Sequence, residues 1–214
     1  MEKQEIRTFG RRHGKKLSPR KMALINDLLP ALMPNPENSG RRILEIGFGA
    51  GEHVRALTND NPDAEIIGAE PFVNGVAALL SAITDDKTNA LLPPYRNIRI
   101  WPDDVRILLR DAKYMFDEIW ILHPDPWPKA RHEKRRLLQA EFITLLSQHL
   151  KNGGRIIIGT DHWDYYDWIL DQVKNTSMYI VSGEFKIIET RYQHKNMADT
   201  AAPKYLILGH QNGI

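Results

Sequence analysis

The chain has 214 residues, 42% hydrophobic and 26% charged, proportions typical of one soluble α/β domain with extensions. It contains no cysteine, which excludes disulfides, thiolate metal sites and cysteine nucleophiles. It also lacks both an apolar run approaching the ~20 residues of a membrane span and the apolar core of a secretory signal. We therefore expect a cytoplasmic protein with no membrane partner.

Positive charge is concentrated near the N-terminus. Residues 1–21 hold eight of the 29 Lys and Arg side chains and two acidic ones, so the rest of the chain has a net charge of −4. This pattern predicts a basic extension over 1–39 ahead of one globular domain over 40–214. A second basic block spans Lys129–Arg136. The two blocks favour a polyanionic partner, although a solvated arm and a solvated loop would show the same composition.

Hydrophobic patterning predicts a helix followed by alternating strands and helices. Ser18 and Pro19 are typical of a helix start, and we expect one helix over 19–33. The predicted strands are 41–47, 64–69, 97–101, 116–122, 155–159, 179–188 and 204–208, and the later helices are 52–59, 73–84, 133–150 and 163–174. We expect Gly153 and Gly154 to end the helix at 133–150. The alternation predicts a parallel sheet with helices on both faces and a ligand site beyond its carboxyl edge.

A glycine-rich turn follows the first predicted strand. Gly47, Gly49 and Gly51 allow a sharp turn and close approach of the backbone to a ligand. The spacing G-x-G-x-G differs from the dinucleotide pattern, in which a helix end binds a pyrophosphate. Glu45 and Glu52 flank the glycines, and carboxylates suit a cationic ligand better than a phosphate. We therefore expect S-adenosylmethionine here rather than a nicotinamide dinucleotide.

Acidic residues also follow the next two predicted strands. Glu70 lies 19 residues after Gly51, where a carboxylate can accept hydrogen bonds from both ribose hydroxyls, although it could be an ordinary surface residue. Asp103 and Asp104 follow the third strand. Either one could bind an adenine amino group, and either could instead cap the next helix.

The segment after the fourth predicted strand is the most distinctive in the chain. Three prolines in His123–Lys129 stop regular structure and stiffen the loop. Asp125 can accept N–H bonds, and Trp127 can form the wall of a pocket for a planar base. Because the second basic block begins in this loop, phosphate-binding charge would lie beside that pocket.

Two later segments offer further candidates. Asp161 follows the fifth predicted strand of the parallel set, where it could cap the next helix or face the target base. The segment 189–195 carries hydroxyl, guanidinium, phenol and amide groups, and by its residues alone it is a loop.

With these motifs in place, the chain resembles the bacterial tRNA (guanine-N7-)-methyltransferase family over roughly residues 40–209. The strings that carry the resemblance are LEIGFGAGEH (44–53), GAEPFVNGV (68–76), NIRIWPDDV (97–105), PDPWPKARHEKRRL (124–137), GTDHWDYY (159–166) and TRYQHK (190–195). The resemblance implies a Rossmann-like class I methyltransferase fold, with a seven-stranded, mostly parallel sheet whose last strand is antiparallel. It also implies methyl transfer from S-adenosylmethionine, leaving S-adenosylhomocysteine, to N7 of the variable-loop guanosine 46 of tRNA.

The resemblance also implies roles for individual residues. The cofactor residues would be Glu45, Gly47, Gly49, Gly51, Glu70, Asp104 and Asp125, which favours Asp104 over Asp103. The substrate residues would be Lys129, Asp161, Thr190, Arg191 and Gln193, and Asp125 and Asp161 are the catalytic candidates. The family has glutamate at the position of Gln193, so this chain replaces a charge there with an amide.

The sequence leaves rival functions open. Another methyltransferase acting on RNA, protein or a small molecule would share the glycine loop, a dinucleotide oxidoreductase would need a phosphate cradle, and an RNA-binding module would need no cofactor. We expect no metal, no obligatory protein partner, and a monomer or homodimer. We also expect removal of residues 2–16 to weaken tRNA binding and leave cofactor affinity unchanged.

Overall fold

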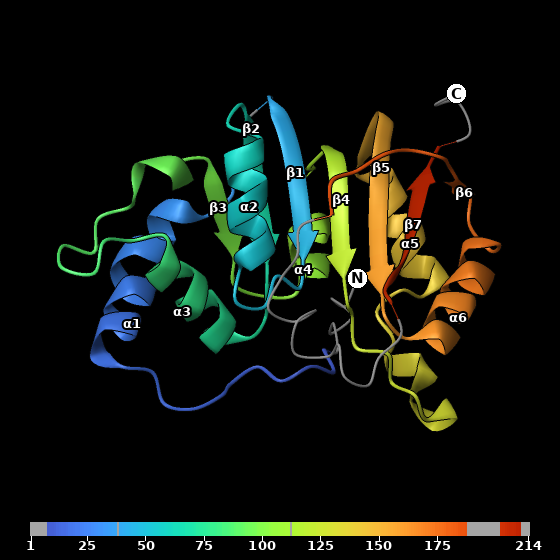
Figure 1. Cartoon of the computed structure of the whole chain (residues 1–214), viewed down its shortest axis with the longest axis horizontal. Coiled ribbons are helices and arrows are strands. Elements are labelled where there is room, and N and C mark those ends of the chain that lie inside the picture. Colours follow the sequence, from blue (N-terminus) through green and yellow to red (C-terminus); the bar gives the residue numbers. More distant parts are fainter. Residues whose placement is uncertain (1–7, 38, 112, 188–201, 211–214) are drawn as a thin grey trace.

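The computed structural model describes residues 8–37, 39–111, 113–187 and 202–210. They form a seven-stranded sheet in the order β3-β2-β1-β4-β5-β7-β6 (Figure 1). The strands are β1 Arg41–Ile46, β2 Ala64–Ala69, β3 Ile98–Trp101, β4 Phe116–Leu122, β5 Leu150–Thr160, β6 Tyr179–Ile180 and β7 Lys204–Gly209. β1 to β5 pair in parallel, whereas β7 pairs antiparallel with β5 and β6. The predicted fold class is confirmed.

Helices cover both faces of this sheet. They are α1 Pro19–Ala23, α2 Glu52–Asp60, α3 Val73–Ala82, α4 Val105–Asp111, α5 Ala140–Gln148 and α6 Trp163–Val173. One core joins α4, α5 and α6 to one face, and a second joins the N-terminal helical segment, α2 and α3 to the other. The strands between the two cores are apolar on both sides; in β1, for example, Ile43 enters one core and Leu44 the other.

The N-terminal helical segment is continuous but irregular. Ser18 caps α1 by accepting a hydrogen bond from the N–H of Lys21, as predicted. The chain then continues through a π-helix, η1 Leu24–Leu28, and a 3-10 helix, η2 Leu29–Leu32. Pro30 has no N–H to donate to the preceding turn, which accounts for the loss of regular α-helix there.

Three sequence predictions about these elements are wrong. The segment 133–150 is not one helix: a 3-10 helix, η4 Ala130–Arg135, precedes α5, which begins only at Ala140. The apolar residues that suggested one helix lie C-terminal to η4, which buries none of its side chains: Leu137 and Leu138 precede α5, and Leu150 begins β5. Gly153 and Gly154 do not end this helix but lie inside β5, which pairs with β4 across an irregular register. The strand predicted over 179–188 reduces to β6, at the sheet edge.

Candidate active site

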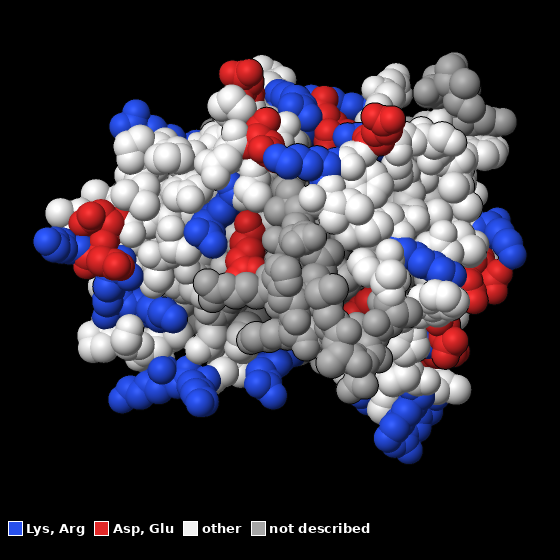
Figure 2. All heavy atoms as spheres, viewed as in Figure 1, with Lys and Arg blue, Asp and Glu red and all other residues white. Residues whose placement is uncertain are grey.

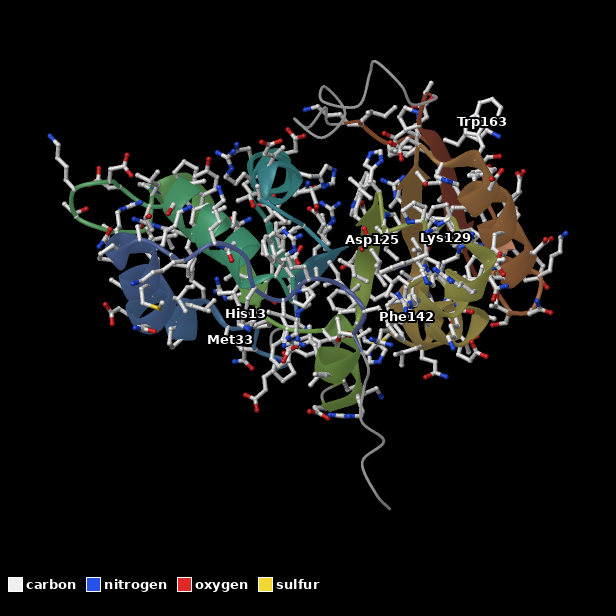
Figure 3. The ribbon with its side chains drawn as sticks, turned by 90° about the horizontal axis from the view of Figure 1, so that it is seen from below. His13, Met33, Asp125, Lys129, Phe142 and Trp163 are labelled. Atoms are coloured by element: carbon white, nitrogen blue, oxygen red, sulfur yellow. The ribbon has the colours of Figure 1, made fainter. Side chains whose placement is uncertain are left out.

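A cavity of about 620 Å³ opens at the carboxyl edge of the parallel strands, where β1, β2 and β4 end. Its walls include Gly47, Glu70, Asp104 and Asp125, four of the predicted cofactor residues. Figure 3 views the molecule from the side of this edge, with Asp125 near its centre and Lys129 beside it. The topology thus brings together residues that are far apart in the sequence.

The glycine loop has the backbone conformation that its sequence predicts. Gly47, Gly49 and Gly51 have φ angles of +77°, +57° and +78°, in the region that other residues rarely adopt. A Cβ atom at Gly47 or Gly49 would meet no atom within 4 Å, so the bare backbone there faces open space. By contrast, a Cβ atom on Gly75 of α3 would collide with the carbonyl oxygen of Gly49. The loop therefore needs glycines for its own turn, and α3 needs a glycine at position 75 in order to pack against the loop.

Glu70 is held at the end of β2 by two backbone groups. Its carboxylate oxygens accept hydrogen bonds of 2.8 Å from the N–H of Gly49 and 2.9 Å from the N–H of Phe72. Burial raises the pKa of Glu70; these two bonds counteract part of the increase, and the charges of Glu45 and Asp125 add to it. The carboxylate is thus fixed in direction and retains lone pairs for hydroxyl donors.

Asp104 is the buried member of the acidic pair after β3. Its carboxylate accepts hydrogen bonds from the side chains of Thr8, at 2.7 Å, and Arg106, and from the N–H of Arg106 at 3.0 Å. Burial would raise the pKa of Asp104, but the bonds from Arg106 and Thr8 outweigh it and lower the pKa. Asp104 therefore caps α4 and lines the cavity at once. Asp103 instead accepts from Arg12, at 2.6 Å, and from the N–H of Asp104.

Glu45 lies beside the cavity rather than in its wall. Its carboxylate is buried 2.9 Å from Nδ1 of His53, on α2, and His53 contacts the ring of Trp120. Glu45 still influences the site electrostatically, through the pKa of Glu70. The expectation that Glu45 holds the cofactor directly remains a prediction.

The proline-rich loop is strained at both ends. His123 and Trp127 have φ angles of +48° and +44°, each costing about 1–3 kcal/mol in a residue with a side chain. The guanidinium of Arg135 lies 5.1 Å from the Trp127 ring centroid. His123 donates its N–H to Gly159 and lies 3.6 Å from Asp161. These contacts hold Asp125 at the cavity mouth, and such over-determined strain is typical of functional sites.

The basic block divides into two kinds of side chain. Lys129, Arg131 and Lys134 are exposed. Arg136, however, is only 5% exposed and donates a 2.9 Å hydrogen bond to the carbonyl of Pro126. Its predicted place in a phosphate-binding block is therefore wrong: burial among aromatic rings keeps it from solvent.

The predicted substrate residues are only partly described. Asp161 sits next to His123 and does not cap α6, because the cap is His162, whose Nδ1 accepts from the N–H of Tyr165. Thr190, Arg191 and Gln193 lie outside the described residues.

The N-terminal arm, which we define as Thr8–Lys16, crosses the mouth of the cavity. Thr8 to Arg11 contribute to its walls, and Phe9 lies 5.6 Å from the guanidinium of Arg135. Further along, the carbonyl of Arg12 accepts from the N–H of Val73, and Gly14 and Lys15 both bond the side chain of Asn74. The sequence predicted the charge of the arm but not its position, because the residue pattern of the arm gives no indication that it contacts α3.

The described residues contain no group of three or more His, Asp or Glu side chains placed to hold a metal ion. Within the same ranges, no helix has the length and apolar character needed to cross a membrane.

Comparisons with known proteins agree on a methyltransferase. A family model described as "Putative methyltransferase" matches residues 39–205. The tRNA (guanine-N(7)-)-methyltransferase of Caulobacter vibrioides strain NA1000 is 37% identical, covering 94% of this chain and 93% of its own. The protein of the same name from Hyphomonas neptunium is 35% identical, covering 91% and 95%.

Solved structures share the fold at low identity. The antibiotic-resistance methyltransferase Kmr superposes with a TM-score of 0.54 at 16% identity, covering 79% of this chain and 86% of that one. The 16S rRNA methyltransferase KamB gives a TM-score of 0.55 at 11% identity, covering 90% and 94%. These likenesses concern the arrangement of strands and helices alone.

Proposed function

The chain belongs to the tRNA (guanine-N(7)-)-methyltransferase family, and we propose that it transfers a methyl group from S-adenosylmethionine to N7 of a guanosine in tRNA. The guanosine is the one at variable-loop position 46, and the second product is S-adenosylhomocysteine. The observation that carries the proposal is a glycine-edged cavity, with the fixed carboxylate of Glu70 in its wall, beside exposed basic side chains at one edge of the sheet.

The residues of the cavity fit S-adenosylmethionine. Glu70 has a carboxylate fixed toward the cavity for the ribose hydroxyls. Asp104 also lies in the walls, and to accept from the adenine amino group its carboxylate would exchange the present bond from Thr8. The open backbone at Gly47 and Gly49 leaves room for the methionine part. The walls carry the carboxylates of Glu70, Asp104, Asp125 and Glu141 together with five basic side chains. Of these carboxylates, Glu70 lies at the glycine loop, where a pyrophosphate would have to bind, and its negative charge disfavours that group there.

The chain's part in the chemistry is mainly positioning. The bound cofactor supplies an electrophilic methyl group carried on a sulfonium cation. Guanine N7 has an in-plane lone pair and no proton, so no side chain has to act as a base. The strained loop holds Asp125 and Trp127 at the mouth, where they can fix the plane of the base. Methylation leaves the guanine positively charged, and the Asp125 carboxylate stabilises that charge as it develops.

Exposed basic side chains on the two segments that contribute to the cavity walls fit the phosphates of tRNA. They come from the loop after β4, with Lys129, Arg131 and Lys134, and from the arm, with Lys15 and Lys16. Figure 2 shows Lys and Arg along the lower edge of the molecule, the edge at which Figure 1 shows the parallel strands ending. A tRNA bound there would have its backbone on the rim and its target base at the cavity.

The test is to incubate the full chain with radiolabelled S-adenosylmethionine and an unmodified tRNA transcript, followed by nucleoside analysis. We expect label in 7-methylguanosine, and none when guanosine 46 is replaced by adenosine. Label in another nucleoside, or label that persists after the replacement, would refute the proposed target. Label in protein only would place the chain with methyltransferases of a different substrate class.

A further inference from the structure

A cluster of two aromatic rings and one cation lies outside the cavity, on the surface near the carboxyl edge. The side chain of Trp163 is 52% exposed, and the ammonium nitrogen of Lys204 lies 4.1 Å from the centroid of its ring. The same nitrogen lies 4.9 Å from the ring centroid of Tyr166. We propose that this aromatic–lysine cluster binds one nucleotide of the RNA substrate, with the indole stacked on a base and the ammonium against a phosphate. The inference rests on the proposed function, which makes the substrate an RNA.

The topology of the sheet explains why these residues meet. Trp163 is the first residue of α6, three positions after the end of β5. Lys204 is the first residue of β7, which runs antiparallel to β5, so it lies opposite Thr160, the last residue of β5. Because β7 runs antiparallel to β5, β7 begins at the edge of the sheet where β5 ends. Figure 3 shows Trp163 in the same half of the molecule as Asp125 and Lys129, at its periphery.

Packing does not account for the position of Trp163. The apolar side of α6 is formed by Tyr165 and Ile169, both fully buried, and by Val173. Trp163 points away from that core and has about half its side chain in water. An indole ring in this position is suited to stacking on a base, which contributes about 1–3 kcal/mol per base in single-stranded nucleic-acid sites.

The cation in the cluster remains available to a phosphate. Within the described ranges no carboxylate forms an ion pair with Lys204; its ammonium is held by ring faces instead. A cation–π contact leaves the charge of the ammonium intact, unlike a salt bridge, which would neutralise it. The ammonium covers one face of the indole, and a base can stack on the other.

A short path connects the cluster to the active site. Asp161 lies two residues before Trp163 and is 3.6 Å from His123, which lines the cavity. A nucleotide near the target guanosine could therefore reach Trp163 while the guanine occupies the mouth. This would hold the RNA strand on the side of the site opposite the arm.

The experiment measures dissociation constants for an unmodified tRNA transcript with the full-length protein. We expect Trp163→Ala to weaken tRNA binding about tenfold, Trp163→Phe to restore most of it, and S-adenosylmethionine affinity to stay at the wild-type value. Lys204→Gln should weaken binding and reduce the salt slope by about one. The matched control is Tyr179→Ala, which removes another exposed aromatic, 46% exposed, from β6. Tyr179 pairs with Gly209, the last residue of β7, and therefore lies at the end of the sheet opposite to the carboxyl edge of the parallel strands.

Three outcomes would overturn the inference. In the first, Trp163→Ala and Lys204→Gln bind tRNA within twofold of wild type. In the second, Tyr179→Ala weakens tRNA binding as much as Trp163→Ala does, and in the third, Trp163→Phe binds tRNA as weakly as Trp163→Ala. Because the readout is binding, it is separate from the test of the proposed function. If the protein binds tRNA through Trp163 yet forms no 7-methylguanosine, the proposal for the cluster stands and the proposed function is refuted.

Discussion

The Nε atom of Arg136 donates a 2.9 Å hydrogen bond to the carbonyl oxygen of Pro126, in the middle of the strained loop. The same guanidinium lies 5.3 Å from the ring centroid of Tyr165 and 4.9 Å from that of Trp168, both on α6. Arg136 thus ties the loop that carries Asp125 to a helix of the core. Its role is to fix the shape of the site.

We expect Arg136→Ala to lower the free energy of unfolding by about 2–4 kcal/mol, from the loss of buried cation–π contacts and a charge-assisted hydrogen bond. Turnover should fall by at least tenfold, because Asp125 loses its support, while the salt dependence of tRNA binding stays the same. The neighbouring control is Arg131→Ala: it should reduce the salt slope by about one and leave stability near wild type. If Arg136→Ala instead reduced the salt dependence of tRNA binding, the Arg136 side chain would have to contact phosphate, and the structural role would be wrong.

For Asp125→Ala we expect turnover to fall by more than ~100-fold, the usual effect of losing a positioned catalytic group. Asp125→Asn keeps the shape and removes the charge, so stabilisation of the cationic guanine predicts a comparable loss. Single-turnover assays with saturating tRNA and cofactor would measure both. Near-normal turnover in the Asn variant would limit Asp125 to hydrogen bonding.

The affinity for S-adenosylmethionine should depend on pH through Glu70. Because burial raises the pKa of this carboxyl above its ordinary 4.5, protonation begins at a higher pH than for an exposed glutamate. Ribose hydroxyls bind the ionised form, so affinity is complete above the raised pKa and is lost as the pH falls through it. Calorimetric titrations over a pH series would show this decline. The Glu70→Gln variant should bind S-adenosylmethionine about tenfold more weakly at neutral pH and should show no such decline as the pH falls. An identical decline in the variant would assign the titration to another group.

Deletion of residues 2–16 should have two effects. It should flatten the salt dependence of tRNA binding, because it removes basic side chains. The sequence predicted unchanged cofactor affinity, but Thr8 to Arg11 lie in the cavity walls, so we now expect faster dissociation of the cofactor as well. Deletion of residues 2–7 alone retains those four residues and serves as the control. Stopped-flow displacement of the cofactor should separate the two variants, and equal rates would mean that the arm does not retain the cofactor.

The sequence by itself determined the order of strands and helices, the fold class and the candidates at the strand ends, because periodicity and turn chemistry are local properties. It also determined the family, through motifs such as PDPWPK at 124–129. Its errors fell where local signals were ambiguous. The apolar spacing within 133–150 suits one helix, yet its first members lie in the non-helical link before α5 and its last one begins β5. Gly153 likewise suits both a helix end and an irregular strand.

Only the tertiary structure decided which charged groups face the cavity, which are buried and which are paired. Thr8 meets Asp104 across 96 positions of sequence, and Glu45 turns toward His53 rather than into the cavity wall. Such contacts depend on how the helices pack on the sheet, and no local pattern of residues encodes them. A charge count therefore could not distinguish Arg136, which is buried beneath the strained loop, from Arg131, which is exposed beside it.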